Sequence, residues 1–129
     1  ACKFDAGNNL SSDTRAIYQF SLITKTLTKE PLFTVDIKSV EKILGEKTKF
    51  APSALALNPM DNNYYILSAV GNLLVVCDGK GNVIKVHHFK NPLFIQPEGI
   101  AFSANGDMYI SNEGKSDKAN ILLFKYKKN

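Results

Sequence analysis

The sequence predicts an all-β protein built from β-propeller blades, each a sheet of four antiparallel strands. Residues 52–59 match residues 97–104 in character at a shift of 45 positions, and residues 65–68 match 109–112 at a shift of 44. The matching segments are short, apolar and rich in β-branched and aromatic residues, and Gly, Pro, Asn and Asp separate them. A period of this length that yields strands and turns is typical of propeller blades.

Size and composition limit the alternatives. With 129 residues, of which 44% are hydrophobic and 22% charged, the chain has the length and composition of one globular domain. No apolar run approaches the roughly 18 to 20 residues that span a bilayer, so we expect no transmembrane segment in this chain. The net charge is +4, but the lysines are scattered, so we interpret them as a solvated surface and expect no nucleic-acid partner.

Residues 1–35 are predicted to be a truncated blade. Residues 5–14 form a loop, and strands at 15–22 and 31–35 pair as a hairpin across a polar connection at 24–30. Projecting the repeat backwards makes Ala1-Cys2-Lys3 the end of the blade's second strand. An alternative is that Ala-Cys marks the end of a bacterial lipoprotein signal, in which case Cys2 would be lipidated.

Residues 36–45 are predicted to be a short helix inserted between blades. Asp36 or Ser39 can cap its start, and Gly45 is placed to end it. Four apolar residues fall on one face at helical spacing: Ile37, Val40, Ile43 and Leu44. A helix this short is marginal alone, so its apolar face must pack against the sheets.

Residues 50–90 are predicted to be a complete blade and residues 95–129 a three-stranded last blade. The complete blade has strands at 53–57, 64–69, 72–77 and 83–89, with a hairpin turn at 78–82. The last blade ends in a strand at 120–127, whose lysines suit an exposed edge. About two and a half blades leave open faces, so we expect either a fragment of a longer propeller or self-association through those faces.

Several phrases together support a family resemblance. The most specific is Gln-Pro-Glu-Gly-Ile at 96–100, paired with Ser-Asn-Glu at 111–113. The others are residues 50–59, 65–68, and 73–76 followed by Asp78 and Gly81. These phrases resemble the SdiA-regulated (YjiK-like) propeller family. The resemblance implies a six-bladed, TolB-like propeller of which this is the C-terminal half. It also implies export to the bacterial periplasm or a membrane-associated envelope location, and no defined biochemical activity.

Three residues of the last blade are candidate ligands. Glu98 begins the innermost strand of this blade and can face the mouth of the propeller's central channel. Asn112 and Glu113 end the second strand of the same blade. Carboxylate and amide oxygens are the ligands that Ca²⁺ prefers, although six to eight are usually needed. Glu98 and Glu113 are therefore the candidate metal ligands. The alternative is that Glu98 only fixes backbone geometry or pairs with a lysine.

The candidate chemistry is not repeated in the other blades. Ser53 occupies the position equivalent to Glu98, and Ser68 the position equivalent to Asn112. Lys3 takes the matching mouth position in the first repeat, where it could pair with a carboxylate. We include all three residues in the predicted ligand-binding mouth, which is therefore asymmetric.

The pattern favours a non-enzymatic module that binds a ligand, an ion or an envelope protein. Because related propellers include calcium-dependent lactonases, the alternative is a calcium-dependent lactonase or esterase-like hydrolase. Such an enzyme needs a base near its metal, and the two histidines, His87 and His88, are adjacent in an outer strand where they point to opposite faces. We assign no catalytic residue.

Overall fold

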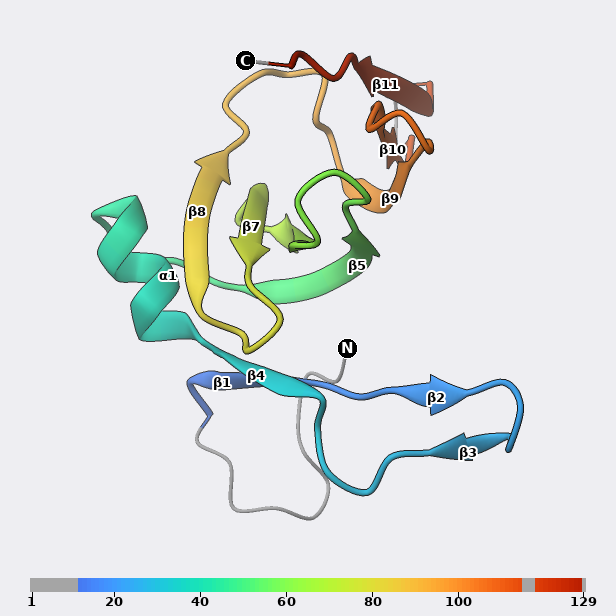
Figure 1. The fold of residues 1–129 in the computed structure, drawn as a ribbon. Helices are drawn as coiled ribbons and strands as arrows, with labels where there is room; N and C mark the ends of the chain where they lie inside the picture. The colour runs from blue at the N-terminus through green and yellow to red at the C-terminus, as the bar shows by residue number, and fades with distance from the viewer. Residues whose placement is uncertain (1–11, 115–117, 129) are drawn as a thin grey trace.

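The computed structural model describes residues 12–114 and 118–128. Within these residues, strands dominate and form four antiparallel sheets, and a single helix is present (Figure 1). The strands are β1 (Thr14–Ile17), β2 (Phe20–Ser21), β3 (Thr26–Leu27), β4 (Phe33–Asp36), β5 (Ala51–Leu57), β6 (Tyr64–Val70), β7 (Leu73–Cys77), β8 (Val83–His88), β9 (Pro97–Phe102), β10 (Met108–Asn112) and β11 (Asn120–Phe124). The prediction of an all-β protein with antiparallel sheets is confirmed.

The largest sheet contains four strands in the order β5-β6-β7-β8, each paired with its neighbour in sequence. All four predicted strands of the segment 50–90 are present, with ends that differ by one or two residues. The predicted turn after β7 is also confirmed, because Asp78 Oδ1 accepts hydrogen bonds from the backbone N–H groups of Lys80 and Asn82. Consecutive hairpins therefore build this sheet.

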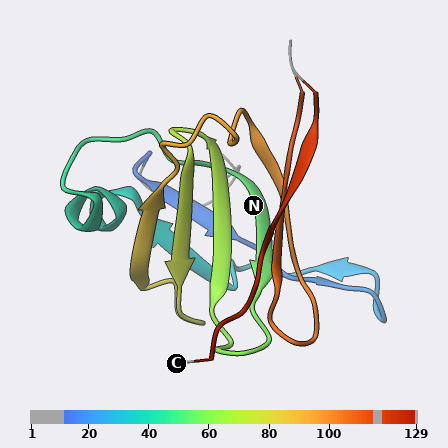
Figure 2. The same cartoon turned by 90° about the horizontal axis from the view of Figure 1, so that it is seen from above.

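A three-stranded sheet in the order β11-β10-β9 lies beside the four-stranded sheet, as Figure 2 shows. The prediction of a final strand over 120–127 is wrong at its end, because β11 stops at Phe124. Asp107 explains the early stop: its carboxylate binds Lys125 Nζ at 2.7 Å and accepts from the backbone N–H of Tyr126 at 3.0 Å. These bonds direct residues 125–128 away from the β10 edge.

The N-terminal hairpin is longer than predicted. β1 pairs with β4 as expected, but the predicted polar connection contains β3, which pairs with β2. This β2–β3 arm projects away from the sheets in Figure 2, and its apolar side chains Leu22 and Ile23 are 83% and 94% exposed. The polar composition of residues 24–30 gives no strand signal, because β3 is only two residues long and pairs only with β2.

Helix α1 (Ile37–Leu44) begins and ends where the capping residues predict. The Asp36 carboxylate accepts from the backbone N–H groups of Lys38 and Ser39, and Gly45 adopts the left-handed conformation at φ 83°. Val40 is fully buried, but Ile43 is 45% exposed, so its predicted place in the buried face is wrong. Figure 1 shows α1 lying alongside β8, at the end of the four-stranded sheet.

Two apolar cores cover the two faces of the four-stranded sheet. On one face, residues of β6 and β7 pack with β1, β4 and α1, and the buried members are Ile17, Phe33, Val35, Val40, Phe50, Ile66, Leu73, Val75 and Cys77. On the other face, Leu67 and Leu74 pack against Ile110 of the three-stranded sheet. Cys77 is a buried free thiol, and burial raises its pKa to about 12. The sheet is thus enclosed between two others.

No helix of the described residues is long and apolar enough to cross a membrane.

Candidate functional site

Two predicted carboxylates lie together around one amide. Gln96 Nε2 donates a hydrogen bond to Glu98 Oε1 and another to Glu113 Oε2, and each bond is 2.9 Å long. The two carboxylate oxygens therefore lie no farther apart than twice that distance. Both glutamates are exposed, and Gln96 is half-buried. We call Gln96, Glu98 and Glu113 the carboxylate–amide cluster.

Strand geometry accounts for this meeting. Gln96 and Glu98 are two residues apart in an extended segment, so their side chains lie on the same side of the strand. β9 and β10 are antiparallel with Asn112 opposite Pro97, and the Glu113 backbone N–H donates to the Gln96 carbonyl at 2.9 Å. The register of the hairpin thus places Glu113 beside Gln96.

Asn112, the third predicted ligand, precedes Glu113 in the chain and is buried, with 3% exposure. Its Nδ2 group donates to Asn120 Oδ1 at 2.9 Å, and Asn120 Nδ2 donates to the Leu93 carbonyl at 3.2 Å. Among the described residues, Asn112 Oδ1 has no hydrogen-bond partner. An unsatisfied buried acceptor costs about 1–3 kcal/mol, so a cation or donor that reached this oxygen would be stabilised.

The two predicted serines hold backbone together instead of joining the cluster. Ser53 Oγ donates to the Pro97 carbonyl at 2.8 Å, which ties β5 to the start of β9. Ser68 is fully buried; its hydroxyl accepts from the Ala51 backbone N–H at 3.0 Å and donates to the Val70 carbonyl. These bonds lie at the end of the β5–β6 pairing, where the register shifts. Lys3 and Cys2 lie outside the described residues.

The cluster has two negative groups and, in the described part of the chain, no cationic side chain paired with them. The lysine–carboxylate ion pairs there are Lys38–Asp13, Lys47–Glu41 and Lys125–Asp107, and the His88 imidazole lies beside Glu46. The predicted alternative, a lysine partner for Glu98, is therefore not seen among these residues. The neutral Gln96 amide holds the two carboxylates close without cancelling their charge, which leaves a local excess of negative potential.

The oxygen count limits what the cluster can bind by itself. Two carboxylates and the amide oxygens of Gln96 and Asn112 are hard ligands. They supply four oxygens when each carboxylate binds through one atom, which is fewer than the six to eight that Ca²⁺ usually takes. The described residues contain no group of three or more His, Cys, Asp or Glu side chains arranged for a metal ion. A cation here would complete its shell with water or with oxygens from elsewhere.

Gln96 was missing from the predicted site, although a signal for it exists. It stands two residues before Glu98, and this spacing places side chains together on one side of a strand. The pairing with Glu113 could not be read in the same way, because it depends on the hairpin register and on the shift between Ser111 and Asn112.

No family model, curated protein or solved structure matches this chain. The resemblance to the SdiA-regulated family therefore stays a prediction.

Proposed function

We propose that the chain is a non-enzymatic binding module, part of a β-propeller, and that it binds Ca²⁺ at the carboxylate–amide cluster. The observation that supports this function is the double hydrogen bond from one Gln96 amide to Glu98 and Glu113. It brings together on one amide group two carboxylates that have no cationic partner among the described residues, with their bonded oxygens no farther apart than twice 2.9 Å. The envelope location implied by the family resemblance belongs to the same proposal.

The stacking of the sheets supports the propeller part of the proposal. Leu55 and Ile66 form a cross-strand pair that packs toward β1 and β4. Their counterparts one repeat later, Ile100 and Ile110, form the same pair and pack toward the four-stranded sheet. In both sheets, the face that carries this equivalent pair packs against the preceding sheet in the chain, as it does in successive propeller blades.

The proposed binding requires one local rearrangement. In the free cluster, the Gln96 amide presents its N–H groups to both carboxylates. A turn of this amide would present its oxygen instead, so that Gln96 changes from a hydrogen-bond donor to a cation ligand. Asn112 directly precedes Glu113 in the chain. Its buried side-chain oxygen lacks a hydrogen-bond partner among the described residues, so it is a further candidate ligand.

Binding is favoured over the hydrolase alternative by the position of both histidines. His87 and His88 lie on β8, at one edge of the four-stranded sheet. The strands of that sheet that contact β9 are chiefly β5, at the opposite edge, and its neighbour β6. His88 Nδ1 is 3.6 Å from Glu46 Oε1, on the side of the molecule occupied by α1. Neither imidazole is therefore placed to act as a base beside the cluster.

Isothermal titration with CaCl₂, together with NMR shifts of the Gln96 side-chain amide, tests the proposal. We expect saturable binding, with shifts confined to residues near 96, 98, 112 and 113. The double variant Glu98→Gln/Glu113→Gln should weaken binding by about tenfold or more, because both charged ligands are lost. Glu30→Gln, an exposed glutamate between β3 and β4, is the matched control and should bind like the parent. Absence of binding heat, or equal affinity in the double variant, would refute the proposed site.

A further inference from the structure

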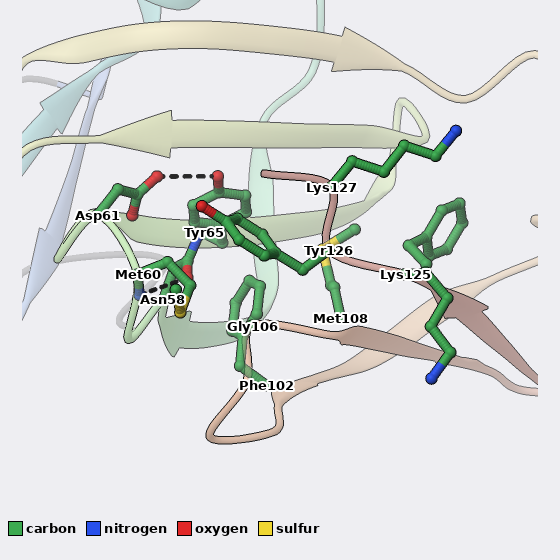
Figure 3. Close-up of a pocket in the computed structure, with 11 residues that line it drawn as sticks. Asn58, Met60, Asp61, Tyr65, Phe102, Gly106, Met108, Lys125, Tyr126 and Lys127 are labelled. Carbon is green, nitrogen blue, oxygen red and sulfur yellow. Dashed lines mark hydrogen bonds between the residues drawn. The ribbon is translucent and has the colours of Figure 1, made fainter. Parts of the chain in front are cut away.

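A second candidate site lies at the opposite end of β9 from the carboxylate–amide cluster. Here a pocket of about 290 Å³ opens between the turn after β5, the β9–β10 turn and the C-terminal segment 125–127. Figure 3 shows the residues that line it. This volume is at the lower end of the range for small-molecule pockets, so the pocket suits a fragment-sized ligand.

The lining of the pocket combines aromatic and thioether groups with one carboxylate. Phe102 and Tyr65 meet edge to face with ring centroids 5.0 Å apart, and Met60 and Met108 line the pocket beside them. Figure 3 shows the Tyr126 ring extending from the C-terminal segment across the pocket toward Tyr65. Such faces attract cations through the negative potential above an aromatic ring.

Asp61 provides the acidic group. Its Oδ2 accepts a hydrogen bond from the Tyr65 hydroxyl at 3.2 Å, and its Oδ1 accepts from the Asn63 backbone N–H at 2.9 Å. Burial raises the pKa of Tyr65, so its hydroxyl remains a donor at neutral pH. Asp61 is exposed and retains acceptor sites on both oxygens, so it can also bind a ligand.

The two lysines that line the pocket do not neutralise Asp61. Lys125 Nζ is paired with Asp107 Oδ2 at 2.7 Å, and this ammonium, followed by the Tyr126 N–H, holds the pKa of Asp107 below its ordinary value. Figure 3 shows the ammonium ends of Lys125 and Lys127 pointing away from Asp61 and Tyr65. The carboxylate thus faces the pocket without an opposing charge from these residues.

Gly106 makes room for this arrangement. It has a positive φ of 89°, and a Cβ atom there would come within 2.5 Å of Met60 Cγ and 3.0 Å of Tyr126 Cγ. Only glycine lets the β9–β10 turn approach both side chains so closely. The two walls of the pocket are therefore built against the same turn.

We propose that this pocket binds a small organic ammonium ion, a protonated amine that carries one aromatic or aliphatic group. The apolar group occupies the space among Phe102, Met60 and Met108. The ammonium lies against the Tyr65 and Tyr126 rings and donates a hydrogen bond to Asp61. This pairing of ring faces with one carboxylate selects a cation over a neutral or anionic molecule of the same shape.

The test compares phenethylammonium with phenethyl alcohol, which has nearly the same shape but no charge. Each is titrated into the full chain while the backbone amides of Gly106 and Tyr126 are followed by NMR. We expect saturable shifts with the ammonium and an affinity about tenfold weaker for the alcohol. Asp61→Asn keeps the acceptor for the Asn63 N–H, so it should fold, lose about tenfold in affinity for the ammonium and leave binding of the alcohol unchanged.

Asp78→Asn is the matched control, because Asp78 caps backbone N–H groups in the β7–β8 turn in the same manner and lies outside the pocket. This variant should bind both compounds like the parent. The proposal is overturned if the ammonium does not bind, if the alcohol binds equally well, or if Asp61→Asn retains the parent affinity.

Discussion

Gly81 is the residue whose missing side chain lets the β7–β8 turn pack against β4. It has a φ of 86°, in the left-handed region, and a Cβ atom there would collide with the Thr34 carbonyl oxygen and lie 3.0 Å from Phe33 Cδ2. A side chain at residue 81 would therefore strain the backbone at positive φ and would also clash with the Thr34 main-chain carbonyl. Gly79 stands two residues away in the same turn, and apart from its chain neighbours no atom of the described residues lies within 4 Å of a Cβ added there.

We predict that Gly81→Ala lowers the free energy of unfolding by about 3 kcal/mol, because positive φ and the contact with backbone both penalise alanine. Gly79→Ala should change it by no more than about 0.5 kcal/mol. Urea denaturation followed by circular dichroism measures both. Equal destabilisation by the two substitutions would contradict the close approach of this turn to β4.

At the same scale, Gln96, Ser53 and Ser68 show how hydrogen bonds assign roles that residue type leaves open. The serines have hydroxyls suited to ligands, yet they bond to backbone groups of β9 and β6. Gln96, a neutral residue, joins the two carboxylates. Which polar side chain is left to bind a ligand depends on which backbone groups need a partner.

At the scale of elements, α1 shows that helical spacing locates the buried face only approximately. Val40 is fully buried in the first core and Ile37 and Leu44 pack against it, but Ile43 lies at the margin of this stripe and is 45% exposed. The width of the buried stripe depends on what covers the helix, here chiefly β8 and β4.

We predict that Val40→Ala lowers the free energy of unfolding by about 2 kcal/mol or more, because it leaves a cavity in the core. Ile43→Ala should cost less than about 1 kcal/mol, since its side chain is half in solvent and alanine favours the helix. Thermal and urea denaturation of the two variants measure the difference. A larger loss for Ile43→Ala would restore the original assignment of that residue to the buried face.

Residues 125–128 show a second limit at the element scale. Their alternating lysines suit a strand. Asp107, however, is buried in the β9–β10 turn, and its carboxylate accepts hydrogen bonds from Lys125 Nζ and from the Tyr126 backbone N–H. A buried carboxylate needs such partners, and the segment that supplies them leaves the sheet. This departure forms one wall of the pocket beside Asp61.

At the level of the whole molecule, the outer face of the three-stranded sheet carries mostly small or apolar side chains. Gly99, Ala101, Tyr109, Ser111, Ile121 and Leu123 share this face by their cross-strand register. Ile121 is 71% exposed and Leu123 is 47% exposed. The equivalent face of the four-stranded sheet is covered by the three-stranded sheet itself, so the repeat predicts that another sheet covers this one.

We predict that the 129-residue chain self-associates through this face when no further sheet covers it. Sedimentation velocity should show a sedimentation coefficient that rises with concentration, and Ile121→Lys/Leu123→Glu should abolish the rise without changing the circular dichroism. Ile84→Lys, at an exposed position on the edge strand β8, is the control and should associate like the parent. A parent chain that remains monomeric at all concentrations would contradict the prediction.

Residues close together in the chain are sufficient to locate most of the local elements. Alternation and turn chemistry located the four strands from β5 to β8, and the caps Asp36 and Gly45 bounded α1, because these preferences depend on residues close together in the chain. The same local reasoning selected Glu98 and Glu113 from the two strands of one hairpin, and both carboxylates bond to the Gln96 amide.

Which of these polar groups remain available to bind a ligand depends on contacts between distant parts of the chain. Three features depend on strand register or burial: the Gln96 bridge, the Asn112 oxygen that lacks a partner in the described part of the chain, and the diversion of residues 125–128 by Asp107. Short-range propensity contains no information about which distant backbone groups compete for a side chain. The pocket beside Asp61 is the clearest case, because two turns and the C-terminal segment meet there from separate parts of the chain.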